Sequence, residues 1–121
     1  MKRAIVIIGI MLLGITGFSQ NKNAKASIAV DGVCGMCKER IEKAAIRTKG
    51  VKSANWNLET HELKLIYNEE RTDLTKIQQS IADSGHDTRD IKAKDEVYTT
   101  IDDCCKYRDP KVVEDHKDGG H

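Results

Sequence analysis

Short strand-like and helical segments alternate between residues 26 and 93, and this order constrains the fold more than any other feature of the sequence. Residues 27–30 form a short alternating segment that ends at an Asp-Gly turn signal, as expected for a strand. Residues 36–49 lack Pro and Gly and carry apolar side chains at helical spacing. Residues 51–58 and 62–67 alternate apolar and polar side chains across a short turn. They predict a hairpin with one buried face.

The second half of this unit repeats the helix and strand. Asp73 is a suitable N-cap for a helix that runs to Ser84-Gly85, and residues 88–93 are typical of a short edge strand. The order strand, helix, strand, strand, helix, strand predicts an α+β ferredoxin-like βαββαβ sandwich, with two helices on one face of a four-stranded antiparallel sheet.

The N-terminus predicts export. Lys2 and Arg3 precede an uncharged apolar run, Ala4–Gly17, and small residues flank a cleavage position after Ser19. This pattern is typical of a secretory signal peptide at residues 1–19. A membrane anchor is the alternative, but the run has 14 residues, whereas a bilayer span needs roughly 20. The sequence therefore predicts a periplasmic or secreted protein with no stable membrane anchor after cleavage.

Loss of the signal peptide changes the charge balance. It removes two of the 20 basic residues, which leaves 18 against 19 acidic residues and takes the net charge from +1 to −1. Nucleic-acid binding would require a basic excess, so that function is not expected. The remaining length suits one domain and a monomer, preceded by a loose linker at residues 20–25. No nucleophile triad, phosphate-binding glycine loop or paired carboxylates appear in the sequence, and an enzyme is not expected.

The sequence continues beyond the βαββαβ unit. Residues 94–108 predict an added C-terminal helix, capped by Asp95, with Cys104 and Cys105 near its end. Residues 109–121 contain Pro110 and two terminal glycines among mixed charges, and predict a disordered tail.

Two cysteines lie between the first strand and the first helix, in Cys34-Gly35-Met36-Cys37. Thiolates near a helix N-terminus are stabilised by unpaired backbone N–H groups and the helix dipole. Two soft ligands at this spacing suit Cu(I), with Hg(II), Zn(II), Ag(I) and Cd(II) as competitors. Basic residues of the following helix, Lys38, Arg40 and Lys43, offset the charge of such a complex and are candidates for guiding a partner.

The same pair allows two other interpretations. One is a static disulfide in an exported interaction domain, and the other is a periplasmic thiol–disulfide carrier. Disulfide carriers of the thioredoxin type usually have a Trp before the first Cys and a Pro facing the pair. Here Val33 precedes Cys34, and the single Pro of the chain is Pro110. Metal binding is favoured, and the carrier remains the alternative.

Residues 30–42, with their Cys-Gly-Met-Cys loop, resemble the metal loop of the heavy-metal-associated (HMA) domain. The similarity continues through Gly50-Val51, residues 57–60 and residues 82–87, and so covers roughly residues 26–93. The family includes copper chaperones, the periplasmic mercury-binding protein and modules of metal-pumping P-type ATPases. The resemblance implies the ferredoxin-like fold, metal ligation by the two loop cysteines, and transient docking to a metal transporter or another metal-binding protein.

The sequence departs from the family pattern at two places. The loop is one residue shorter, because Gly32 stands two positions before Cys34, and Val33 replaces the usual Met. His86 stands where the family commonly has Tyr, Phe or Lys. It is a candidate third metal ligand, although a solvent-facing loop His is the favoured interpretation.

The second cysteine pair lies outside the resemblance. A strand over 88–93 and a helix ending near Tyr107 each cover about 20 Å. If the helix folds back along the sheet, Cys104 or Cys105 reaches Cys34 and Cys37 and forms a three- or four-thiolate centre. The alternative is one buried and one exposed thiol.

Overall fold

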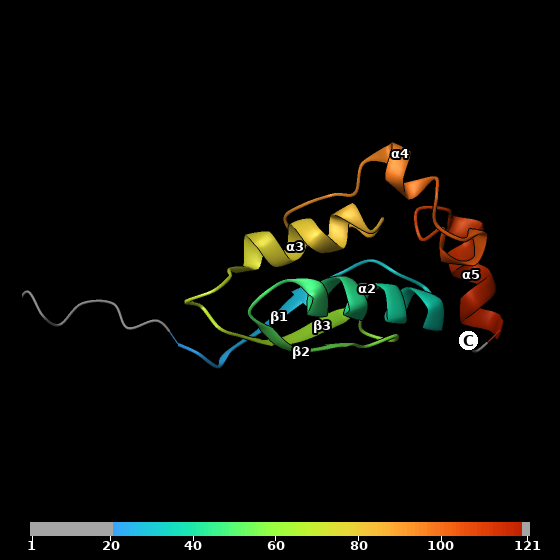
Figure 1. Ribbon diagram of the computed structural model, residues 1–121. Coiled ribbons are helices and arrows are strands. Elements are labelled where there is room, and N and C mark those ends of the chain that lie inside the picture. The colour runs from blue at the N-terminus through green and yellow to red at the C-terminus, as the bar shows by residue number, and fades with distance from the viewer. Residues whose placement is uncertain (1–20, 120–121) are drawn as a thin grey trace, which may run out of the picture.

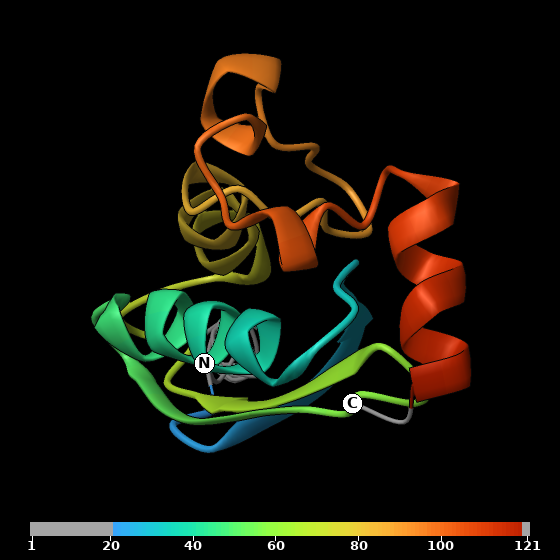
Figure 2. The same cartoon turned by 90° about the vertical axis from the view of Figure 1, so that its right-hand side faces the viewer.

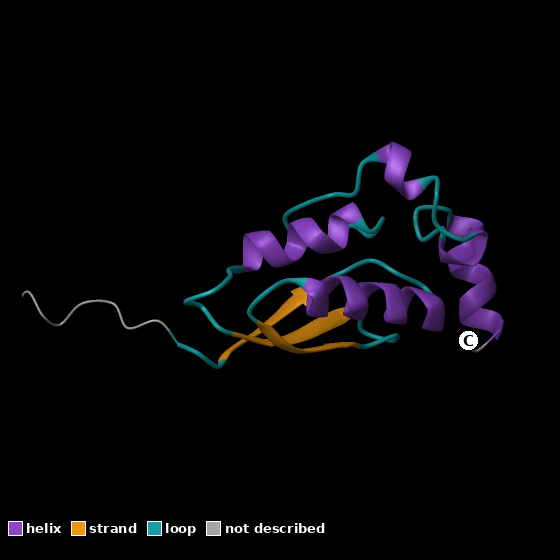
Figure 3. Cartoon of the chain, in the orientation of Figure 1, coloured by secondary structure: helices purple, strands orange, loops and turns teal. Residues whose placement is uncertain are grey.

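The computed structural model describes residues 21–119 (Figure 1). The βαββα part consists of β1 (Ala24–Ala29), α2 (Gly35–Arg47), β2 (Val51–Trp56), β3 (Glu62–Tyr67) and α3 (Leu74–Asp83). Three short helices follow, namely α4 (Asp95–Tyr98), the 3₁₀ turn η1 (Asp103–Cys105) and α5 (Pro110–Gly119) (Figure 3).

The three strands form an antiparallel sheet in the order β1-β3-β2, with Ile28 and Trp56 both opposite Leu63 of the central strand. Helices α2 and α3 lie on the same face of this sheet (Figures 1 and 2). The arrangement is the predicted ferredoxin-like fold, with the hairpin and both helices close to their predicted bounds.

The core lies between the sheet and the two helices, and Trp56 joins it to the loop before α2. The Trp56 side chain is 1% exposed, and its indole N–H donates to the carbonyl of Val30 at 3.0 Å. A Cβ atom at Gly32 would lie 3.0 Å from the Trp56 ring and 3.1 Å from the Cys37 Cβ. A side chain at this position would force the Trp56 ring or Cys37 to shift, so the close contact of the loop with the core favours glycine here.

The predicted fourth strand over residues 88–93 is wrong. In the described residues, only the single bridge between Val30 and Thr88 remains of it. The segment turns instead, because the backbone N–H and the hydroxyl of Thr88 both donate to the carbonyl of Ile91, at 2.8 and 2.7 Å. Asp90 is held by a reciprocal pair of hydrogen bonds with the buried Gln78 of α3. These bonds replace a strand ladder.

The single helix predicted over residues 94–108 is also wrong. It is divided into α4 and η1, with an extended break at Asp102 (φ −59°, ψ 145°). The hydroxyls of Thr99 and Thr100 donate back to backbone carbonyls of α4 at 2.9 and 2.6 Å, which favours helix termination. The loose linker predicted for residues 20–25 ends earlier, since β1 begins at Ala24.

The tail prediction for residues 109–121 fails where the structure describes it, since residues 110–119 form α5. Pro110 is compatible with this helix, because Pro is favoured at the first helical position. The preceding Asp109 accepts a hydrogen bond from the backbone N–H of Lys111 at 2.9 Å, as an N-cap does.

The predicted signal peptide, residues 1–19, lies outside the described residues. Among residues 21–119, no helix has both the length and the apolar character needed to cross a bilayer.

Gly85 supplies a test of how tightly the C-terminal part packs on the domain. Its φ is +110°, and a Cβ there would lie 2.5 Å from the Cγ2 of Ile101. We expect Gly85→Ala to lower the free energy of unfolding by about 2 kcal/mol or more, because it adds backbone strain to overpacking. The matched control is Gly35→Ala in the first turn of α2, where a Cβ meets no atom within 4 Å. This change should be neutral or stabilising by roughly 0.5 kcal/mol. Equal urea midpoints for the two variants would contradict the expectation.

Candidate metal centre

Cys34 is the N-cap residue of α2, with extended backbone angles (φ −146°, ψ 176°), and its carbonyl accepts the first helical bond from Lys38 at 3.0 Å. Its side chain does not cap the helix, so the sulfur is left for other contacts. Cys37, one turn further, is fully buried against the core. The sequence places both thiols at the start of this helix, and the structure confirms that position.

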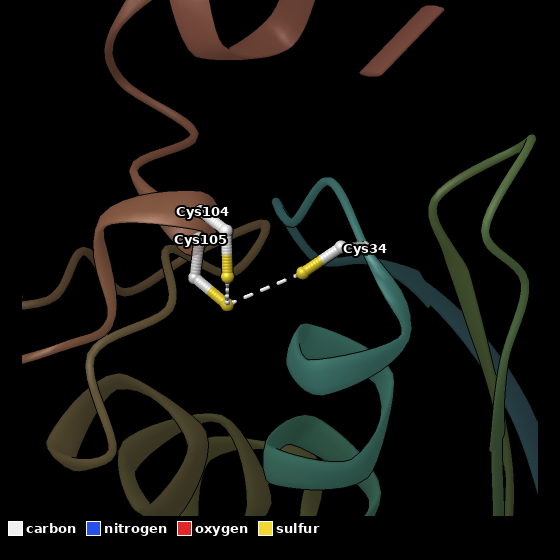
Figure 4. Close-up of side chains that lie close together, drawn as sticks. All are labelled: Cys34, Cys104 and Cys105. Carbon is white, nitrogen blue, oxygen red and sulfur yellow. Dashed lines mark hydrogen bonds between the residues drawn. The ribbon is translucent and has the colours of Figure 1, made fainter. Parts of the chain in front are cut away.

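Four thiols meet at this point. The Cys34 sulfur lies 3.5 Å from that of Cys37 and 3.3 Å from that of Cys105, and all four cysteines are free thiols. The Cys105 sulfur is in turn 4.0 Å from that of Cys104. The sulfurs of Cys34, Cys104 and Cys105 lie within 4.8 Å of one another, and Figure 4 shows them pointing toward a common space. The second pair thus reaches the first, as hypothesised, but from the η1 turn and not from a long helix.

The four thiols differ in how readily they ionise. Burial opposes ionisation of Cys34, yet the backbone N–H of Cys37 and the neighbouring thiols bring its pKa below the usual value. Burial raises the pKa of Cys37. Burial and the neighbouring thiols raise the pKa of Cys104 to about 11 and that of Cys105 to about 12. Cys34 is therefore the first thiolate to form, and the natural first contact for a soft cation.

Arg40 supplies positive charge beside the cluster. Its Nη2 pairs with Asp102 at 2.9 Å. Its Nη1 is buried without a hydrogen bond in the described part of the chain. Burial disfavours the charged guanidinium, but Cys105 and Asp102 together raise the pKa of Arg40 above its usual value. Arg40 is thus placed to offset the negative charge of a metal–thiolate complex.

The segment that carries Cys104 and Cys105 is fixed to the loop after α3. The Tyr107 hydroxyl donates to the carbonyl of Gly85 at 2.7 Å and accepts the backbone N–H of Asp87 at 2.9 Å. The Tyr107 ring stacks on His86 with centroids 5.3 Å apart. The Tyr107 side chain therefore bonds the backbone of Gly85 and of Asp87 and packs against the ring of His86 between them.

Arg108 makes the strongest polar contacts of this interface. Its guanidinium bonds both carboxylate oxygens of Asp87, at 2.7 and 3.2 Å, and also reaches Asp95 at 2.9 Å and the carbonyl of Ala93 at 2.7 Å. Although burial opposes it, this contact holds the pKa of Asp87 below its usual range. A bidentate arginine–carboxylate pair adds geometric specificity as well as energy.

His86 is fully buried, so the favoured interpretation of a solvent-facing loop residue is wrong. Its Nδ1 contacts the carbonyl of Asp31 at 2.8 Å, which requires the proton on Nδ1, and its Nε2 has no partner among the described residues. Within those residues, His86 does not belong to the group of ligand atoms lying within 4.8 Å of one another. It supports the metal loop through Asp31.

Two further groups near the thiols were not expected from the sequence. The thioether of Met36 lies 3.5 Å from the Cys104 sulfur, and Met36 is 48% exposed. A pocket of about 530 Å³ opens here, lined by Cys34, Cys104, Met36 and His116 among others. Met36 stands between the two loop cysteines in the sequence, whereas His116 reaches the pocket from α5, where the sequence predicts a disordered tail.

The helix charges are less available for docking than expected. Lys38 bonds the carboxylate of Glu42, the side chain of Asn55 and the carbonyl of Trp56. Arg40 pairs with Asp102, while Lys43 is exposed.

The fold agrees with that of known proteins. A sequence model of the heavy-metal-associated domain matches residues 27–87, half of the chain. The chain belongs to the heavy-metal-associated domain family. The copper chaperone CopZ of Staphylococcus haemolyticus (strain JCSC1435) is 30% identical over 63 residues, which is 51% of this chain and 93% of CopZ.

Two further relatives support the assignment. The copper-exporting P-type ATPase of the same Staphylococcus haemolyticus strain is 29% identical over 90 residues, 74% of this chain but 11% of the ATPase. A solved CopZ metallochaperone matches with a TM-score of 0.52 and 30% identity, over 54% of this chain and 98% of that chain. The HMA match ends at residue 87, so Cys104 and Cys105 lie beyond it.

The buried imidazole predicts a pH dependence. Burial lowers the pKa of His86 to about 4, although the Asp31 carbonyl partly opposes this. The unfolded chain, with a histidine pKa near 6.5, therefore takes up this proton first. Stability should be fully present above about pH 6.5 and fall as the pH drops toward 4, by up to roughly 3 kcal/mol. Urea unfolding of the wild type and of His86→Gln at several pH values measures the difference. Parallel stability curves over pH 6.5–4.5 would exclude His86 as the cause.

Proposed function

We propose that this HMA-domain protein binds a soft metal cation, Cu(I) first of all, and sequesters it or transfers it by thiolate exchange. Cys34 and Cys37 are the primary ligands. The observation that carries this proposal is the pair of thiols 3.5 Å apart at the N-terminus of α2, one of them with a lowered pKa. Thiolates in such a place favour soft cations, and Hg(II), Zn(II), Ag(I) and Cd(II) are the competitors.

Two different features support the proposed location of the protein and its proposed partner. Residues 1–19 support export to the periplasm or outside the cell. The similarity to copper chaperones and to part of a copper-exporting ATPase supports a metal transporter or another metal-binding protein as the partner. Docking is transient, the partner's thiols attack the bound ion, and the protein acts as a monomer without catalysing a reaction.

Removal of the loop thiols tests the proposal. The Cys34→Ser/Cys37→Ser variant should lose Cu(I) affinity by more than the ~10–100-fold that loss of an outer-shell partner costs, because both primary ligands are gone. Competition against a coloured Cu(I) chelator under reducing conditions measures this affinity. Lys64→Ser, at an exposed position of β3, serves as the control and should bind as the wild type does. Wild-type affinity in the double Ser variant would refute the function.

A thiol–disulfide carrier is the second candidate, favoured by the same short sulfur–sulfur distance. The two functions differ in measurable properties of the wild type. A carrier would combine an oxidising reduction potential of the Cys34/Cys37 pair with weak Cu(I) binding. The metal-binding function requires tight Cu(I) binding with the thiols reduced.

A further inference from the structure

We propose that Cys105 is a third ligand to the ion held by Cys34 and Cys37, so that the metal centre is shared between the HMA domain and the C-terminal segment. This inference rests on the proposed function and deepens it. The HMA match ends at residue 87, and the ligand lies beyond that point.

The sulfur positions carry the argument. With metal–sulfur bonds of about 2.3 Å, two sulfurs lie ~3.8 Å apart in a tetrahedral site, ~4.0 Å apart in a trigonal one and ~4.6 Å apart in a linear one. The Cys34 sulfur lies 3.5 Å from that of Cys37 and 3.3 Å from that of Cys105. Both separations are closer to the trigonal and tetrahedral values than to the linear one. Cys34 therefore lies close enough to share one ion with Cys37 and with Cys105, and the three-thiol site requires the side chains of Cys37 and Cys105 to turn toward that ion.

Cys105 and Cys104 differ in their positions. Cys105 is fully buried, like Cys37, and contacts Cys34 directly. Cys104 is half-buried, 4.0 Å from Cys105 and 3.5 Å from the Met36 thioether at the pocket. Cys105 is thus the inner ligand. Cys104 is the nearest additional sulfur, available to a cation that takes four thiolates.

The surroundings suit a charged complex. Three thiolates around Cu(I) carry a net charge of −2, which is costly to bury without compensation. Arg40 lies beside Cys105, and its buried Nη1 makes no other hydrogen bond in the described structure. Its position gives the complex a permanent positive neighbour.

Enclosure by the C-terminal segment also affects release. A partner must displace the η1 turn before its own thiols can replace Cys105, and that turn is held by the contacts of Tyr107 and Arg108 with residues 85–87. Exchange from this protein should therefore be slower than from a loop with two ligands alone.

The coordination number tests the inference directly. X-ray absorption spectroscopy of the Cu(I)-loaded wild type should give three sulfurs per ion. Cys105→Ser should give two and hold Cu(I) more weakly, by about 10-fold or more, since a thiolate ligand is lost. Cys104→Ser separates the two cysteines of η1: it should keep three sulfurs, whereas a fall to two in this variant would make Cys104 the third ligand and would overturn the inference. Two sulfurs in the wild type would overturn the inference.

Two further measurements distinguish a variant that does not fold from an inference that is wrong. Should Cys105→Ser not fold, as judged by circular dichroism, the sulfur count of the wild type decides alone. Arg108→Ala keeps all four thiols while loosening the segment, and it should speed Cu(I) loss to an added chelator by about 10-fold. That figure corresponds to loss of roughly 1.4 kcal/mol of docking energy. An unchanged rate of Cu(I) loss in Arg108→Ala would count against the shared centre, as would two sulfurs in the wild type. Neither result touches the proposed function, which is upheld as long as Cys34→Ser/Cys37→Ser loses Cu(I) binding.

Discussion

Asp87 connects the three segments that build the candidate site. Its carbonyl accepts the backbone N–H of Asp31 in the metal loop at 2.9 Å, and its own N–H donates to the Tyr107 hydroxyl. Its carboxylate receives Arg108 and the backbone N–H of Ala93. Because all its polar groups are used, Asp87 fixes the loop, the end of the HMA domain and the C-terminal segment relative to one another. The meeting of Cys105 with Cys34 depends on this junction.

Burial of the thiols affects both how the cluster packs and how readily its members ionise. Free cysteines pack as small apolar groups, so burial of the Cys105 side chain itself favours docking of the segment that carries it. The same burial raises the pKa of Cys37 and of Cys105, and these two thiols then resist ionisation until a cation replaces their protons. Packing thus holds the ligands close together, while their charge develops only on metal binding.

Local periodicity was enough to predict the HMA part of the fold. The strand over residues 62–67 and the helix capped by Asp73 lie where the pattern indicates, because one buried face and one cap suffice to specify each of them. The loop thiols could be predicted for the same reason, since their position follows from a strand-to-helix junction. The hairpin over residues 51–58 and 62–67 buries one face as predicted, with Trp56 and Leu63 in the core.

The structure of residues 88–108 could not be predicted from the sequence, because contacts with distant residues determine it. The turn at residues 88–91 depends on the pairing of Asp90 with Gln78, and the position of η1 depends on Tyr107 and Arg108 reaching the loop after α3. No local pattern contains these partners. His86 was misjudged for the same reason, since it is buried by a tyrosine 21 positions further along the chain. By contrast, Asp109 and Pro110 are a local signal for the start of a helix, and the tail predicted over these residues is wrong because it ignores that signal.

Residues 103–108, called the covering segment below, affect how readily a metal loop of this family would release its ion under the proposed coordination by Cys105. An ion on two exposed thiolates is open to attack by a partner, so its exchange is limited mainly by the encounter. An ion that also binds a buried thiol of the covering segment has two barriers to exchange, the loss of that ligand and the opening of the Asp87–Arg108 contact. If Cys105 binds the ion as proposed, both interactions stabilise the loaded state more than the encounter complex, and release slows while the route of thiolate exchange stays intact. The proposed three-thiol centre would then suit a protein that holds a soft cation under competition better than one that passes it on at each collision.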